Sequence, residues 1–141
     1  MKRKASAVWN GDLKSGKGTI SSDSGVLKNT QYSFSTRFES GVGTNPEELI
    51  ASAHAGCFAM AFSAELGKAG FTPASIHATA TVTLDKTDAG WTVTESHLDM
   101  TAKIPGIDQG KFTEIANGAK AGCPISRLLN AKVTLDAKLE A

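Results

Sequence analysis

A long stretch without a charged side chain, LIASAHAGCFAMAFSA at residues 49–64, constrains the fold more than any other part of the sequence. It is shorter than the ~20 apolar residues that a membrane-spanning helix needs, and it contains His54 and two serines. It therefore predicts a buried helix of a globular domain and no membrane span. Because the stretch is apolar all round, we expect burial on every side of this helix. Its many small residues would let another backbone approach closely.

The limits of this helix are marked by start and stop signals. Thr44 or Asn45 can cap the N-terminus, and Pro46 suits the first helical position. Two glutamates follow in the first turn, where the positive end of the helix dipole favours acids. The helix can run to about Lys68, because Gly70 provides a stop.

The rest of the chain alternates between strand and helix patterns. Period-two alternation over residues 76–85, the turn at DAG and the β-prone run that follows predict a hairpin. The apolar phase slips between Val93 and Leu98, which favours a bulge there. Other predicted strands are residues 5–10, 17–22, 31–38 and 132–140, with helices over 108–122 and at 124–130. The order predicts a single α+β domain over residues 1–141.

Composition narrows the classes of partner. The formal net charge is +1, so no strong positive electrostatic field favours binding to nucleic acid. The basic cluster at residues 2–4 is typical of a solvated tail. No signal peptide is visible at the N-terminus, which favours a cytoplasmic protein. Cytoplasmic thiols are normally kept reduced, so a permanent structural disulfide is not expected.

The chain has two cysteines, Cys57 and Cys123, and their residue types leave inert packing, metal ligation and transient redox chemistry open. Cys57 lies well inside the predicted helix with no charged neighbour in sequence, and burial alone would raise its pKa. A reactive Cys57 would therefore need a cation from elsewhere in the fold, and the chain offers Arg3, Arg37 and Arg127. Cys123 precedes Pro124 at a break between helices, where a helix N-terminus stabilises negative charge.

His54 lies three residues before Cys57, on the same helix face. This spacing allows His54 and Cys57 to form a base–nucleophile pair, or to supply two ligands of a zinc site. The zinc hypothesis is weak, because the sequence has no CxxC pair. A polar histidine packed against the sheet is the third interpretation, and we prefer it.

Two segments carry a resemblance to a known family: TNPEELIASAHAGCFAMAFSAELGKAGFTP and AKAGCPISRLL. Together with VWNGDLKSGKGTISSDSGVL and TLDKTDAGWTVT, they resemble the OsmC/Ohr family of thiol peroxidases over nearly the whole chain. RFE before the long helix and NPEELI within it are most similar to the osmotically inducible OsmC branch.

The resemblance implies a fold and a set of site residues. The fold would be OsmC-like, with antiparallel sheets around a long central buried helix and a second helix, in an intertwined homodimer. Cys57 falls on the peroxidatic cysteine and Cys123 on the resolving one. Arg37 falls on the arginine brought to the peroxidatic thiolate, and Glu47 on the carboxylate that orients it. Neither a metal nor an organic cofactor is expected.

The implied reaction reduces organic hydroperoxides, and hydrogen peroxide as a poorer or variable substrate, to alcohols and water in oxidative or osmotic stress. Cys57 would become a sulfenic acid, and Cys123 would condense with it to a disulfide. An external dithiol would reduce the disulfide, with a lipoyl group as one candidate by analogy with Ohr. The alternatives are a redox sensor of the same fold and a small-ligand-binding protein with inert cysteines. Phe58, Met60 and Phe62 could line a substrate pocket, although such residues are more often core.

Overall fold

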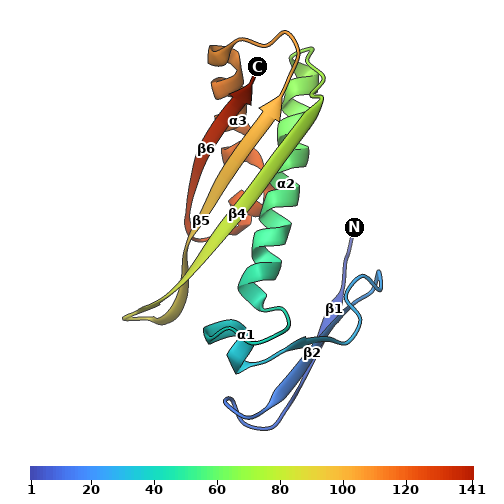
Figure 1. Cartoon of the computed structure of the whole chain (residues 1–141), viewed down its shortest axis with the longest axis vertical. Coiled ribbons are helices and arrows are strands. Elements are labelled where there is room, and N and C mark those ends of the chain that lie inside the picture. The colour runs from blue at the N-terminus through green and yellow to red at the C-terminus, as the bar shows by residue number, and fades with distance from the viewer. The chain divides into compact units, whose positions relative to one another are not determined.

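The computed structural model describes residues 1–141, and the contacts of the chain group into two compact units, Met1–Leu49 and Ile50–Ala141. The single domain over residues 1–141 stays a prediction. Figure 1 shows the elements, which in chain order are β1 (Ala5–Asn10), β2 (Lys17–Ser22), β3 (Thr30–Tyr32), α1 (Phe34–Phe38), α2 (Pro46–Lys68), β4 (Ser75–Thr87), β5 (Gly90–Lys103), α3 (Gln109–Gly122), α4 (Pro124–Leu128) and β6 (Lys132–Glu140).

The first unit holds the antiparallel sheet β1–β2–β3 and the short helix α1. The prediction of one strand over residues 31–38 is wrong, because β3 ends at Tyr32 and a helical turn follows. The physical reason is a capping box. The Ser33 side chain accepts a hydrogen bond from the Thr36 backbone N–H, and the Thr36 hydroxyl accepts one from the Ser33 N–H at 2.8 Å. The local hydrogen bonds therefore override the β propensity of the residues.

The second unit holds the sheet β4–β5–β6. Strands β4 and β5 form the predicted antiparallel hairpin, whose pairing shifts at Thr83 and Leu84 so that Thr94 on β5 has no partner in the register. This confirms the predicted bulge. The expectation of purely antiparallel sheets is wrong for one pair, because β6 runs parallel to β5. Between these strands the chain crosses over through α3 and α4, which returns it to the same end of the sheet.

The long helix α2 begins and ends as predicted. The Asn45 side chain accepts a hydrogen bond from the Glu48 backbone N–H at 2.7 Å, which makes Asn45 the N-terminal cap ahead of Pro46. At the other end, Gly70 adopts a φ of 87°, a conformation that glycine reaches without strain. Each of these signals acts on the backbone beside it.

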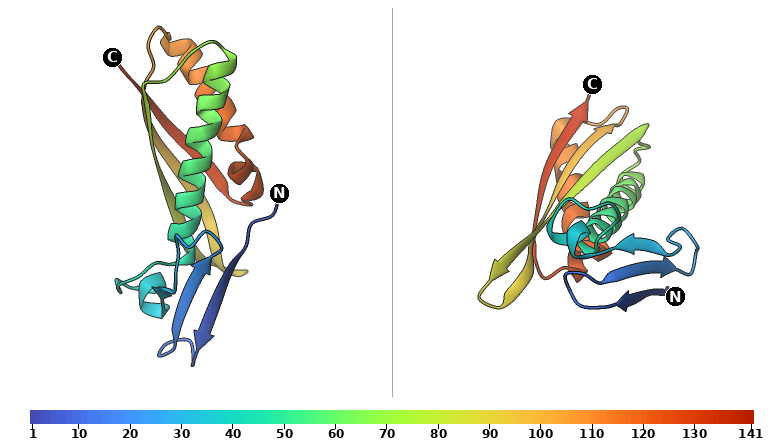
Figure 2. Two further views of the ribbon diagram at one scale, coloured as in Figure 1. Left: turned by 90° about the vertical axis from the view of Figure 1, so that its right-hand side faces the viewer. Right: turned by 60° about the horizontal axis from the view of Figure 1, so that its bottom comes forward.

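One face of α2 packs into the core of the second unit. Phe58, Phe62 and Leu66 are fully buried in a cluster with residues of β5 and α3. The rings of Phe62 and Phe112 meet edge to face with 5.8 Å between their centroids. Figures 1 and 2 show α2 and α3 side by side along the sheet β4–β6. The apolar packing fixes the rotation of α2 about its axis, and therefore the direction in which Cys57 points.

The opposite face of α2 is exposed in the isolated chain, so the expectation of burial on every side is wrong for this chain alone. Met60 is 76% exposed. By length and composition, with a mean hydropathy of 1.3, α2 also passes a test for membrane-crossing helices, which the core helices of globular proteins pass as well. The other exposed positions of this face are small or polar: Ser52, Ala53, Gly56, Ser63, Ala64 and Gly67.

Candidate active site

The two cysteines lie together in the second unit. Cys57 is in the middle of α2 and partly buried, whereas Cys123 is fully buried at the junction of α3 and α4. Both are free thiols, and each lies close enough to the other to shift its pKa. Two residues far apart in the sequence are therefore brought close together.

The geometry at Cys123 follows from the proline after it. Cys123 ends α3 and caps α4, with an extended backbone (φ −61°, ψ 134°), as the residue before a proline favours. Its sulfur accepts a hydrogen bond from the backbone N–H of Ser126 at 3.4 Å. The sequence-based expectation of a cysteine at a break between helices is confirmed.

The pKa values of the two thiols move in opposite directions. Burial raises the pKa of Cys57, and the hydrogen bond and charge of Cys123 raise it further, while the backbone of Ile125 lowers it. Burial also raises the pKa of Cys123, but hydrogen bonds from Ser126, Cys57 and Ile125 outweigh it, so that this pKa is lowered. Within this unit, negative charge is therefore better stabilised on Cys123 than on Cys57.

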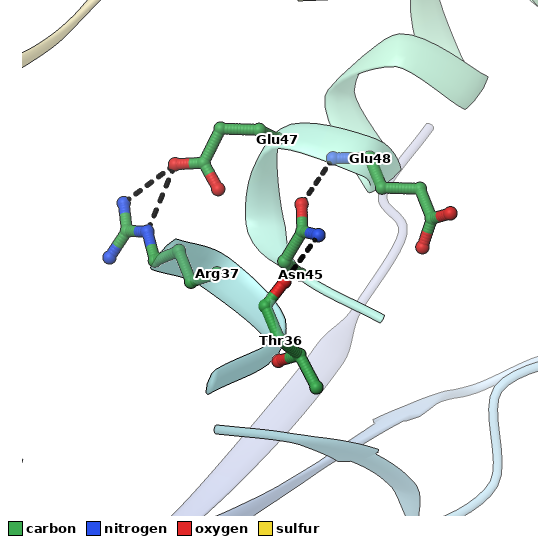
Figure 3. Close-up of polar contacts among 5 residues, drawn as sticks. All are labelled: Thr36, Arg37, Asn45, Glu47 and Glu48. Carbon is green, nitrogen blue, oxygen red and sulfur yellow. Dashed lines mark hydrogen bonds and ion pairs between the residues drawn. The ribbon is translucent and has the colours of Figure 1, made fainter. Parts of the chain in front are cut away.

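The other two predicted site residues meet in the first unit. Arg37 is in α1 rather than in the strand predicted over residues 31–38. Its Nε and Nη2 donate hydrogen bonds to Glu47 Oε1 at 3.0 and 2.8 Å (Figure 3). The Glu47 side chain is only 12% exposed. The guanidinium also lies 5.4 Å from the centre of the Phe38 ring. The forked contact and the ring orient the arginine, because both restrict the plane of the guanidinium.

Further hydrogen bonds hold α1 against the start of α2. The Asn45 side chain donates to the Thr36 carbonyl at 2.9 Å, and its oxygen caps the Glu48 N–H (Figure 3). The Thr44 hydroxyl donates to the Glu48 carboxylate at 2.6 Å. One asparagine thus starts α2 and fixes the helix that carries Arg37.

The four predicted site residues therefore form two contacting pairs. Arg37 and Glu47 belong to the first unit, and Cys57 and Cys123 to the second. The Arg37–Glu47 contact is the one that the sequence resemblance implies, and the placement of Arg37 beside the Cys57 thiolate stays a prediction.

The first unit also has an apolar cavity of about 260 Å³ that Arg37 helps to line. Phe58, Met60 and Phe62 of the second unit do not line this cavity. The two phenylalanines are fully buried in the core, and Met60 is exposed. The remaining lining residues of the cavity are Trp9, Leu13, Tyr32, Ser33, Phe34 and Phe38.

His54 is fully buried, and both of its ring nitrogens are hydrogen-bonded. Nδ1 lies 2.6 Å from the Ser96 hydroxyl of β5, and Nε2 lies 2.7 Å from the Ser126 hydroxyl of α4. A zinc site or a nucleophile pair with Cys57 is not supported, because serines occupy both nitrogens. The preferred interpretation, a polar histidine packed against the sheet, is confirmed. Sequence reasoning missed Ser96 and Ser126, although Ser126 is the last residue of the motif AGCPIS.

Burial lowers the pKa of His54. The unfolded chain therefore binds a proton more readily than the folded one, and stability should be lost as pH falls from about 6.5 towards the lower folded pKa. We expect His54→Gln to remove this loss, which is at most about 1.4 kcal/mol per pH unit. Chemical denaturation of both proteins between pH 8 and pH 5 measures it, with the exposed His77→Gln as a control. Equal pH slopes in wild type and His54→Gln would contradict the prediction.

One other cluster could hold a metal ion. The ligand atoms of His97, Asp99 and Asp136 lie within 4.8 Å of one another on the sheet of the second unit. His97 Nε2 is 3.3 Å from Asp99 and 3.2 Å from Asp136, so the ring is engaged with both carboxylates. Neither cysteine belongs to this cluster.

Comparisons with known proteins identify the family of the chain. The family model described as OsmC-like protein matches residues 39–138. The chain is 55% identical to peroxiredoxin OsmC of Escherichia coli over 99% of this chain and 97% of that protein. It is 29% identical to the organic hydroperoxide resistance protein OhrB of Bacillus subtilis over 87% of this chain and 88% of that protein.

Solved structures have the same fold. An OsmC-like protein of Vibrio cholerae has a TM-score of 0.78 at 18% identity, covering 97% of this chain and 99% of its own. The crystal structure of Bacillus subtilis OhrB has a TM-score of 0.68 at 24% identity, covering 97% of this chain and 98% of its own. The α+β architecture is therefore that of OsmC and Ohr proteins, and the chain belongs to the OsmC family.

Proposed function

We propose that the protein is a thiol peroxidase that reduces hydroperoxides in oxidative and osmotic stress defence. The 55% identity to a peroxiredoxin over almost the full chain supports an oxidoreductase of this class. The observation that carries the proposal is the contact between the Cys57 and Cys123 thiols. A pair of thiols already in contact suits a cycle in which one is oxidised and the other resolves it.

In the proposed cycle, the Cys57 thiolate attacks the terminal oxygen of ROOH. The O–O bond breaks, the alkoxide takes a proton and leaves as an alcohol, and Cys57 becomes a sulfenic acid. The Cys123 sulfur then attacks the Cys57 sulfur, the S–O bond breaks, and water leaves. An external dithiol reduces the disulfide by thiol exchange.

The first step needs Cys57 as a thiolate, and its surroundings in the second unit raise its pKa. We propose that Arg37 supplies the missing cation. A guanidinium is permanently charged, so it can bond Glu47 and still stabilise a thiolate. Its two hydrogen bonds to Glu47 support this role, because they limit the directions in which the charge can point.

We propose organic hydroperoxides as the preferred substrates. The cavity of about 260 Å³ is lined mainly by aromatic and aliphatic side chains, and Arg37 is part of its wall. An alkyl or aryl group could occupy such a cavity while the peroxide group stays near the arginine. For the reductant we propose an external dithiol, with a lipoyl group as the first to test.

We further propose an intertwined homodimer. The exposed face of α2, with Gly56, Ala53 and Met60, is one that a globular chain rarely leaves in water. Small residues on a helix allow a second helix to pack closely against it. Sedimentation equilibrium of the reduced protein tests the assembly.

A redox sensor of the same fold is the second candidate. The raised pKa of Cys57 favours it, because a thiol that is mostly protonated reacts slowly with peroxide. A sensor would form the same disulfide but would consume few equivalents of peroxide.

The experiment that tests the proposal is mass spectrometry of the peroxide-treated protein. We expect one main product, a disulfide between Cys57 and Cys123 of the same subunit, because the two thiols are in contact. With an excess of dithiol, the protein should consume many equivalents of cumene hydroperoxide per subunit. A main product linking two subunits would contradict the intramolecular step. Consumption that stops near one equivalent despite the dithiol would favour the sensor.

A further inference from the structure

A continuous chain of hydrogen bonds leads from the sheet to the sulfur of Cys123. Ser96 on β5 contacts His54 Nδ1 at 2.6 Å, and His54 Nε2 contacts Ser126 Oγ at 2.7 Å. Ser126 Oγ in turn lies 3.4 Å from the Cys123 sulfur. Ser96, His54 and Cys123 are fully buried, so the chain runs where water is scarce.

The donors of this chain can all point in one direction. The Cys123 thiol donates to Ser126 Oγ, and the Ser126 hydroxyl can then donate only to His54 Nε2. His54 accepts there and carries its own proton on Nδ1, which donates to Ser96 Oγ. The same hydrogen-bonded atoms can also carry a proton in the opposite direction. His54 Nε2 is then the donor, and the Cys123 thiolate is the final acceptor.

We infer that Ser96, His54 and Ser126 form a proton relay that deprotonates Cys123 for its attack on the oxidised Cys57. This inference rests on the proposed function, since Cys123 needs deprotonation only if it resolves a sulfenic acid. Ser126 touches the reacting sulfur. His54 acts through Ser126, and Ser96 holds the ring of His54 in the orientation that keeps Nε2 on Ser126.

The step balances without another reactant. The Cys123 proton passes to Ser126 Oγ as the Ser126 proton passes to His54 Nε2, which leaves a thiolate and an imidazolium. The thiolate electron pair forms the S–S bond, and the S–O bond of the Cys57 sulfenic acid breaks. The departing hydroxide takes the proton back through Ser126 and leaves as water.

The surroundings of His54 suit a base that holds a proton only transiently. The groups bonded to it from β5 and α4 are two neutral hydroxyls, and no carboxylate or cation forms an ion pair with the ring. The nearest titratable groups in the chain of contacts are the thiols of Cys123 and Cys57. Burial lowers the pKa of His54, so the ring is neutral at rest and free to accept a proton.

The relay is tested by single-turnover oxidation with cumene hydroperoxide, followed by rapid quenching and mass spectrometry. Dimedone trapping counts the sulfenic acid, and the digest counts the disulfide. We expect His54→Gln and Ser126→Ala to slow the conversion of sulfenic acid to disulfide by at least about tenfold at pH 7. The deficit should shrink as pH rises, because Cys123 then loses its proton to the solvent.

Two variants keep the result interpretable. Ser126→Thr keeps a hydroxyl and should restore most of the rate. Ser75→Ala removes an exposed hydroxyl at the start of β4 and should change nothing. If His54→Gln does not fold, Ser126→Ala decides alone, because it keeps the backbone N–H that bonds Cys123.

A second measurement is independent of the peroxidase reaction. In a Cys57→Ser background, the ultraviolet absorbance of the thiolate reports the ionisation of Cys123, and Ser126→Ala should shift this titration to higher pH. If the wild-type protein formed no sulfenic acid, the proposed function would be wrong. The titration of Cys123 would still measure the effect of its contact with Ser126. The relay is wrong if folded His54→Gln forms the disulfide at the wild-type rate. It is equally wrong if the slowing is the same at every pH, since that indicates a packing role only.

Discussion

Cys57→Ser should abolish turnover with organic hydroperoxides, and Cys123→Ser should leave a single oxidation. The first step uses only the Cys57 sulfur, whereas the second requires a partner thiol within bonding reach. With Cys123→Ser we expect about one equivalent of peroxide to be consumed per subunit. The product should be a sulfenic acid that a large excess of peroxide converts to sulfinic acid.

Peroxide consumption and the mass of the intact protein measure both outcomes. Circular dichroism should be unchanged, because serine is close to cysteine in size. The pair is informative because Cys123, not Cys57, has the lowered pKa in the second unit. If Cys57→Ser still consumed peroxide at the wild-type rate, the roles of the two cysteines would be reversed.

Arg37→Ala should slow the peroxide step at pH 7 by at least about tenfold, which corresponds to a rise of one unit in the pKa of Cys57. The reason is that burial and the neighbouring Cys123 oppose ionisation of Cys57, so the thiolate depends on a cation. Part of the rate should return at higher pH, when the thiol ionises without help. Stopped-flow rates against pH measure the effect.

Two further variants separate the charge from its position. Arg37→Lys should restore only part of the rate, because an ammonium cannot make the forked contact that Nε and Nη2 make with Glu47. Glu47→Gln keeps the size of the side chain but weakens the contact, so we expect a larger defect in rate than in the pKa of Cys57. Arg3→Ala, far from α1 in the sequence, is the matched control. If folded Arg37→Ala kept both its rate and its Cys57 pKa, another cation would be responsible, and Arg127 would be tested next.

The sequence predicted those parts of the fold that local signals determine. Asn45 and Pro46 define the start of α2, and Gly70 its end, because each acts on the backbone next to it. The bulge at Thr94 was visible as a break in alternation. The turn of helix at α1 was not predicted, because Ser33 and Thr36 form their capping box among residues with high β propensity.

The features that went unpredicted depend on residues far apart in the chain. The parallel pairing of β5 and β6 follows from the route of the crossover, which no strand pattern specifies. The partners of His54 lie on two other elements, β5 and α4, so the spacing between His54 and Cys57 gave no sign of them. For the cysteines and for Arg37 and Glu47, the family resemblance supplied pairings that charge and periodicity left open.

The contact between Cys57 and Cys123 also has a mechanical consequence. A disulfide there would tie the middle of α2 to the junction of α3 and α4, closing a loop of roughly 66 residues that includes the β4–β5 hairpin. Closing a loop of that length reduces the entropy of the unfolded chain and stabilises the folded state by about 4 kcal/mol. The oxidised protein should therefore melt at a higher temperature than the reduced one. Each turn of the cycle would then alternate between a stiffer and a looser molecule, and a simple melting curve would report which half of the cycle the protein occupies.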